Sequence, residues 1–291
     1  MYNIDLTYKG VKSSPVIFYP LILMKLYKRN LGKDLNLFFP KLFSEKIQYL
    51  KLFDNKKIKT DLTDKLKVLN FLDGKVDSSH IKKVLGVYDS IDEIDISILP
   101  ESFYIKTNHG CKWQKKIESK DFFVKNYDEI KKDFSLWLML NFAYANGLEL
   151  QYKNIIPKIY VEEIVTHPDY MFPIDVEIYC FDGKPRLTSV RAIKDEFCHG
   201  LTLYDMNGKI LPYNFNPSSS FRKIDVVPLP NYHNQMIEIA TELSQGFKIV
   251  RVDFFYTKDN FYFAEMTFTP FSGYCTPDIE LENIISQWFH I

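Results

Sequence analysis

The chain of 291 residues is 46% hydrophobic and 25% charged, which is ordinary globular composition and excludes general disorder. Its 37 basic residues balance 37 acidic ones, so the net charge gives no support to binding of nucleic acid. The four cysteines have no CxxC spacing, which argues against a zinc site or a disulfide framework and favours a reducing, cytoplasmic setting.

The N-terminal third is predicted to be helical. Apolar residues recur at helical spacing in LILMKLYKRNLG (21–32), which ends at Gly32, a candidate C-cap. FSEKIQYLKLF (43–53) and DLTDKLKVLNFLD (61–73) are predicted as two further helices. The apolar stretch PVIFYPLILM (15–24) is too short to span a bilayer. We interpret it as a buried helix, and a peripheral contact with a membrane surface stays open as the alternative.

From residue 100 onward strands dominate the sequence. SFYIKTN (102–108) and IIPKIYVEEIV (155–165) are predicted strands, and residues 173–193 and 201–213 are predicted hairpins that turn at Asp-Gly and Asn-Gly. Helices are expected over about 127–145 and 231–247. The fold class is therefore α+β, with a helical N-terminal region before two α+β lobes of mostly antiparallel strands.

The strands VRVDFFY (250–256) and FYFAEMTF (261–268) each carry one carboxylate in an apolar run. If the loop is Lys258-Asp259-Asn260, Thr257 pairs with Phe261, and Asp253 lies directly opposite Glu265. Two like charges directly opposite each other are destabilising, and a cation bound between them would make the interaction favourable. Two solvated charges on a polar face are the alternative, and a loop one residue longer would separate them.

Several polar residues form a candidate phosphate site in the other half. Lys106 precedes the loop Asn108-His109-Gly110, whose backbone N–H groups could face a phosphate. His109 is either a general base or phosphate donor, or a structural loop histidine. Further candidates lie on the predicted strands. The acids, which need a cationic partner if they are buried, are Glu162, Glu163, Asp175 and Glu177, and the cations that could pair with them or bind phosphate are Arg191 and Arg251. Phosphate-binding cations together with carboxylates favour nucleotide–Mg²⁺ chemistry.

Taken in order, these motifs resemble the ATP-grasp superfamily, and specifically its TupA-like branch, which is associated with cell-surface polysaccharide biosynthesis. The resemblance covers about residues 30–275 and rests on KDLNLFFPKLFSEKIQYLKLFD, TDKLKV, LPESFYIKTNHGCKW, YVEEIV, IYCFDGKP and VRVDFFY…FYFAEMTFTPFSG. It implies a mixed helical lobe over 1–98, a phosphate-loop lobe over 99–165 and a metal-binding lobe over 166–291, with ATP clasped between the two α+β lobes.

The resemblance also implies roles for single residues. Lys65 and Lys106 would contact the phosphates, the loop Asn108–Trp113 would close over them, and Glu162 with the backbone of Glu163–Val165 would read adenine. Asp175 is a further candidate for the nucleotide site. Asp253 and Glu265 would hold Mg²⁺, with Thr267 in the place of a commoner asparagine as the third candidate ligand. Arg251 would steady the transferring phosphoryl group, and Arg191 and His199 are the other catalytic candidates.

Four departures from the branch's pattern bear on activity. They are Thr267 itself, Lys112 and Gln114 in the phosphate loop, Glu177 where lysine is common, and Leu201 where arginine is expected, close to His199. The leading hypothesis is an ATP- and Mg-dependent ligase that joins an amine to a sugar carboxylate in a capsule or O-antigen precursor, with those small molecules as its partners. The alternatives are a kinase-like phosphotransferase and a non-catalytic nucleotide-binding protein of a polysaccharide-assembly complex.

Overall fold

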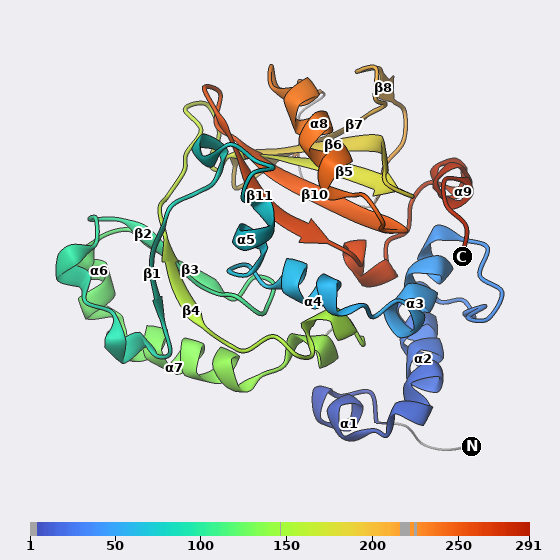
Figure 1. The fold of residues 1–291 in the computed structure, drawn as a ribbon, viewed down its shortest axis with the longest axis horizontal. Coiled ribbons are helices and arrows are strands. Elements are labelled where there is room, and N and C mark those ends of the chain that lie inside the picture. Colours follow the sequence, from blue (N-terminus) through green and yellow to red (C-terminus); the bar gives the residue numbers. More distant parts are fainter. Residues whose placement is uncertain (1–4, 146, 216–221, 224–225) are drawn as a thin grey trace.

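The computed structural model describes residues 5–145, 147–215, 222–223 and 226–291. Two sheets form its two halves, and the N-terminal helices lead from the side of the molecule, at α1–α3, to its middle, where α4 and α5 lie next to β11 (Phe261–Thr267) (Figure 1). Those helices are α1 (Tyr8–Ser13), α2 (Tyr19–Leu31), α3 (Phe43–Phe53), α4 (Lys57–Thr63) and α5 (Val68–Leu72), with 3₁₀ turns η1 (Val16–Phe18) and η2 (Ser78–His80). Gly32 has a φ of 70° and caps α2, as predicted, because glycine adopts this left-handed conformation without a steric cost.

The smaller sheet has four antiparallel strands in the order β1-β4-β2-β3. They are β1 (Val84–Tyr88), β4 (Ile159–Glu162), β2 (Phe103–Thr107) and β3 (Gln114–Ile117). Strand alternation turns Phe103, Ile105 and Val161 toward α6 (Lys120–Lys125) and α7 (Tyr127–Met139), which cover one face of the sheet. The other face carries the polar partners of the same strands, so it is left for the functional site.

The larger sheet has the order β11-β10-β5-β6-β7-β8. Its strands are β11 (Phe261–Thr267), β10 (Ile249–Tyr256), β5 (Ile174–Phe181), β6 (Lys184–Asp195), β7 (Cys198–Tyr204) and β8 (Ile210–Leu211), and the two-residue β9 (Arg222–Lys223) pairs in parallel with β7. One face packs its apolar residues against α8 (His233–Leu243). On the opposite face, the end near Phe181 is covered by α3 and α9 (Ile279–Gln287), and the rest is charged.

Short 3₁₀ turns complete the chain between these elements. They are η3 (Ile91–Glu93), η4 (Ile96–Ile98), η5 (Phe142–Tyr144), η6 (Leu150–Tyr152) and η7 (Pro270–Gly273). The predicted hairpin turn at Asp182-Gly183 is confirmed, with φ of 46° and 72°, and the Asn207-Gly208 turn joins β7 to β8. The expected helix over 127–145 ends earlier, because α7 stops at Met139 and gives way to η5.

The single helix expected over 61–73 is wrong, because the chain breaks it into α4 and α5 at Asp64. The Asp64 carboxylate accepts the backbone N–H of Leu66 at 3.0 Å and the side-chain amide of Asn108 at 2.9 Å. Aspartate bonds readily to nearby backbone N–H groups, which competes with helix continuation. The break therefore follows from a partner on the distant β2–β3 loop.

The apolar stretch 15–24 is divided between core and surface. Ile22 and Leu23 are fully buried, which confirms the buried-helix interpretation for α2, whereas Val16 and Ile17 are exposed in η1. In the described part of the chain, no helix has both the length and the apolar character needed to cross a membrane.

Candidate functional site

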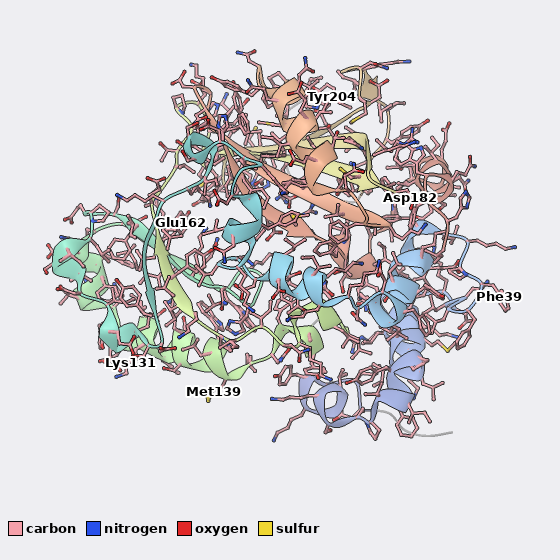
Figure 2. The ribbon with its side chains drawn as sticks, viewed as in Figure 1. Phe39, Lys131, Met139, Glu162, Asp182 and Tyr204 are labelled. Atoms are coloured by element: carbon pink, nitrogen blue, oxygen red, sulfur yellow. The ribbon has the colours of Figure 1, made fainter. Side chains whose placement is uncertain are left out.

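A cavity of about 200 Å³ lies between the polar face of the small sheet and the charged face of the large one. Glu162 stands at the end of β4, where the small sheet approaches the large one (Figure 2). Six residues predicted for the site from the sequence line this cavity: Lys106, Glu162, Glu163, Val165, Asp175 and Arg191. The structure therefore brings together candidates from four strands and from the loop that follows β4.

Glu162 is buried, and its carboxylate forms ion pairs with two lysines. Its Oε1 atom lies 2.6 Å from Lys106 Nζ and 2.7 Å from Lys82 Nζ. Burial raises the pKa of this carboxyl, but the two lysines outweigh it and the net shift is downward. Glu162 is therefore held as a carboxylate, and Lys106 is directed into the cavity from β2.

The segment after Glu162 presents its backbone to the same cavity. The Glu163 carboxylate accepts the Lys83 N–H at 2.8 Å, and the Glu163 N–H donates to Lys83 O at 3.1 Å. This anchors the chain just before Ile164 and Val165, which line the cavity. A fixed, extended backbone beside an apolar wall is suited to recognition of a planar ring by hydrogen bonds.

The loop between β2 and β3 is tightly packed, and two of its predicted residues are buried within it. Asn108 donates to Asp64 and to Ile156 O, and the Lys158 N–H donates to Asn108 Oδ1 at 2.8 Å. His109 Nε2 lies 3.1 Å from Trp137 O, and burial lowers the pKa of its imidazole. These contacts are the ones expected of residues that shape the loop.

Gly110 and Trp113 define the form of this loop. A Cβ atom at Gly110 would lie 2.2 Å from Trp113 Cε3, so no other residue fits there without movement. The Trp113 ring packs edge-on against His109, with 5.2 Å between the ring centroids. Gly110 leaves its carbonyl oxygen free to accept Lys65 Nζ at 2.7 Å.

Lys65 connects the loop to the second sheet. Its Nζ atom is 3.9 Å from Glu265 Oε2, and its backbone N–H donates to Asn108 O at 3.2 Å. Burial raises the pKa of Glu265, but the lowering effect of Lys65 and Arg251 is larger, so the net shift is downward. Lys65 is thus the cation that lies between the predicted phosphate loop and the predicted metal carboxylates.

On the large sheet, three acids stand side by side across three strands. Asp253 on β10 pairs with Glu265 on β11 and with Glu177 on β5. Arg251 lies among them: it donates to both oxygens of Asp253, at 2.8 and 2.6 Å, and is 3.6 Å from Glu177 and 3.8 Å from Glu265. Burial raises the pKa of Asp253, and the guanidinium opposes that shift.

The predicted opposition of Asp253 and Glu265 is confirmed, but the predicted turn register is wrong. Tyr256, not Thr257, pairs with Phe261, and the Thr257 N–H donates to Asn260 O at 2.9 Å. Between Phe254 and Asp253 the register shifts by one residue, which leaves Ala264 without a partner. This β-bulge restores the alignment that the turn alone would have lost.

The carboxylates of this cluster are candidate ligands for Mg²⁺. In the ranges that the structure describes, no three His, Cys, Asp or Glu residues are grouped so as to hold a metal ion. Asp253 and Glu265 nevertheless supply hard oxygen ligands, and Mg²⁺ commonly takes only one or two carboxylates together with phosphate oxygens. The two acids fit such an ion if Arg251 releases Asp253. Thr267 Oγ1 donates to Glu265 Oε1 at 2.9 Å and orients it.

Arg191 extends the charged network toward the cavity. Its guanidinium donates to Asp175 Oδ2 at 2.8 Å and lies 3.8 Å from Glu177. Glu177 therefore stands between Arg191 and Arg251. His199 lies elsewhere, on β7 opposite Ile193, and is not one of the described residues that line the cavity.

Of two residues that stand at the centre of the site, sequence reasoning named Glu177 only as a candidate acid without a defined role, and it missed Lys82. The signal for Glu177 was present, because it shares a strand face with Asp175 and period two carries both toward the site. Lys82 gave no signal, since its importance depends on Glu162 and on Phe255, which lie far away in the sequence.

Similarity to known proteins is found at the level of one family and of distant solved structures. The family described as TupA-like ATPgrasp matches residues 45–286. No significant similarity to a curated protein sequence was found. Among solved structures, D-alanine–D-alanine ligase from Bacillus anthracis is 14% identical with a TM-score of 0.42, over 71% of this chain and 56% of that one.

Two other solved structures have similar values. The ATP-grasp ligase PsnB complexed with minimal precursor is 14% identical, with a TM-score of 0.42 over 80% of this chain and 60% of that one. D-Alanine–D-alanine ligase from Helicobacter pylori is 13% identical, with a TM-score of 0.42 over 79% and 61%. The chain spans less than two thirds of the length of each of these structures. By its match over 45–286, the chain belongs to the TupA-like ATP-grasp family and has the ATP-grasp fold.

Proposed function

We propose that this protein is an ATP- and Mg²⁺-dependent carboxylate–amine ligase. One observation carries the proposal: the Lys106–Glu162 cavity and the Arg251 carboxylate cluster lie on facing sheets and are joined through Asp175–Arg191, and Lys65 joins the Gly110 loop to the same cluster. In the proposal, the cations would bind phosphates and the carboxylates would bind a metal, at two ends of one site. The chain belongs to an ATP-grasp family, and ligation with ATP and Mg²⁺ is the usual reaction of the ATP-grasp superfamily.

In this proposal the nucleotide base lies in the cavity, against the backbone of residues 163–165. The phosphates extend past Lys106 and Lys65 to the cluster, where Asp253 and Glu265 would hold the ion. Mg²⁺ would supply charge stabilisation of the phosphate oxygens. Arg251 then exchanges Asp253 for the transferring phosphoryl group, and Glu177 and Arg191 stay paired beside it.

The proposed reaction has two steps. An acceptor carboxylate oxygen attacks the γ-phosphorus, the bond to the β–γ bridging oxygen breaks, and ADP leaves. An amine nitrogen then attacks the acyl carbon, phosphate leaves with the electron pair of the C–O bond, and the nitrogen loses a proton to give the amide. The residues contribute positioning and charge stabilisation in both steps. We propose a uronic-acid sugar of a capsule or O-antigen precursor as the acceptor and an amino acid or other small amine as the nucleophile.

The test is ADP release from ATP·Mg²⁺, measured against a panel of uronic acid-containing sugar nucleotides, each with and without a panel of amines. The proposal predicts release that needs both a carboxylate and an amine, and a product heavier by the amine less water. Release with a neutral sugar and a phosphorylated product would instead establish a kinase-like phosphotransferase. Binding of ATP·Mg²⁺ without turnover in any combination would favour a non-catalytic role, and no binding at all would overturn the scheme.

A further inference from the structure

The segment Ser78–Lys83 runs from one sheet to the other and is fixed at both. At its start, His80 stacks on Phe261 of β11, with 3.8 Å between ring centroids, and its Nδ1 atom lies 2.8 Å from Asn260 Oδ1. At its end, Lys83 pairs through its backbone with Glu163. Between these anchors, Lys82 lines the cavity.

Lys82 lies in this segment and points into the cavity. Its Nζ atom donates to Glu162 Oε1 at 2.7 Å and lies 4.6 Å from the centre of the Phe255 ring on β10. The side chain is only 8% exposed. Lys82 is therefore a buried cation that contacts strands of both sheets, from a position that sequence motifs do not mark.

The two lysines compete for one oxygen. Lys106 Nζ is 2.6 Å from the same Glu162 Oε1 atom, so a single carboxylate faces two cations. Burial and the nearby Lys106 lower the pKa of Lys82 to about 8, although Glu162 opposes the shift. The other charged or titratable groups that line the cavity are Tyr104, Lys116, Glu163, Asp175 and Arg191.

This arrangement has a consequence for nucleotide binding. If Lys106 turns toward a phosphate, Glu162 loses one of its partners, and a buried carboxylate without a partner is costly. We propose that Lys82 is a positioning residue that keeps Glu162 paired and so releases Lys106 for the phosphates. The inference rests on the proposed nucleotide site, and it gives a role to Lys82, the second lysine that contacts Glu162.

The test compares Lys82→Met, Lys82→Arg and the matched control Lys83→Met, whose side chain is exposed at the next position. Affinity for ATP·Mg²⁺ is measured by calorimetry at pH 7, with thermal unfolding of each variant. Lys82→Met is expected to bind about ten- to hundredfold more weakly, as for loss of a charged hydrogen bond. Lys82→Arg keeps the charge and is expected to restore most of the affinity, and Lys83→Met is expected to stay within about twofold of the unaltered protein.

A pH series separates positioning from a merely structural role. Between pH 7 and pH 9 the affinity of the unaltered protein for ATP·Mg²⁺ should fall about tenfold. Over this range Lys82 of the free protein loses its proton, and a neutral lysine no longer neutralises Glu162. Neither Lys82 variant should show this loss, since arginine stays charged and methionine carries none. Equal affinities for all variants, or the same pH profile in Lys82→Arg, would overturn the inference and leave the proposed function standing. No binding by the unaltered protein would overturn both.

Discussion

Asp253 and Glu265 face each other across β10 and β11 because an unpaired Ala264 corrects the register that their turn sets. Without the bulge, the turn pairing of Tyr256 with Phe261 would place Glu265 opposite Val252, which is buried in the core. The bulge therefore keeps two carboxylates on the charged face, where their mutual repulsion is offset by Arg251. A feature that locally weakens the ladder is what brings the acids together.

The first prediction concerns these two acids. Asp253→Asn and Glu265→Gln should each weaken Mg²⁺-dependent binding of ATP by at least about tenfold, because each replaces a negatively charged carboxylate ligand of the ion by a neutral amide. Calorimetry with and without Mg²⁺ measures the effect. Asp259→Asn is the matched control, since this exposed aspartate lies in the turn of the same hairpin. Metal-dependent binding that survives both substitutions would show that the ion lies elsewhere.

The hairpin also shows how far the sequence leads. Period-two alternation and turn residues predicted β5, β6, β10 and β11, whereas the opposition of the two acids holds only because the bulge offsets the error in the assumed turn register. The bulge at Ala264 was not predictable, since it depends on how the strands pair with one another along their whole length. The acids were placed correctly although the assumed turn register was off by one residue.

Long-range partners account for the other differences. The helix predicted over 61–73 breaks because Asp64 bonds to Asn108, which is on another element. Lys82 becomes important only because β4 and β10 approach it with Glu162 and Phe255. Local patterns record which face of a strand is polar, but they hold no information about which distant side chain will meet it.

A second prediction concerns Arg251, which has 12% side-chain exposure and contacts three acids. Arg251→Met should lower the free energy of unfolding by about 3–5 kcal/mol, because it leaves buried carboxylates without their cation. Urea unfolding measures this loss. Millimolar Mg²⁺ should recover more stability in the variant than in the unaltered protein, since the ion then has no guanidinium to displace.

Arg191→Met is the control for this prediction. That arginine lies on the same face and also pairs with an acid, but its side chain is 49% exposed. Its loss should cost no more than about 1 kcal/mol. Equal losses for the two variants would show that burial does not set the strength of these pairs.

A third prediction tests the packing of Gly110 under Trp113. Gly110→Ala should destabilise the loop by about 1–3 kcal/mol, because its Cβ would lie 2.2 Å from the indole. It should also weaken ATP binding, since Lys65 takes its position from Gly110 O. In the double variant with Trp113→Leu, the alanine should cost much less than it does alone, because the smaller side chain leaves room. Additive losses in this cycle would contradict the proposed clash.

The last prediction concerns Lys51 on α3, a lysine outside the nucleotide cavity that is 1% exposed. Its Nζ atom donates to Gly147 O at 3.0 Å, to Ser272 O at 2.7 Å and to Ser272 Oγ at 2.8 Å. Phe271 and Ser272 have φ of 53° and 54°, a conformation that non-glycine residues hold only when their surroundings enforce it. Lys51 is thus one of the residues that fix the segment after β11.

Burial lowers the pKa of Lys51 from its usual 10.5 to about 8, although the nearby Glu149 opposes the shift. Between these two values the unfolded chain binds more protons than the folded one, so stability rises with pH there. The contribution is at most about 1.4 kcal/mol per pH unit. Lys51→Met should remove that part of the slope between about pH 8 and pH 10, as measured by urea unfolding, whereas Lys57→Met, at an exposed position of α4, should keep it. If all three proteins share one slope, Lys51 is charged in the folded state throughout this range, and burial does not depress its pKa.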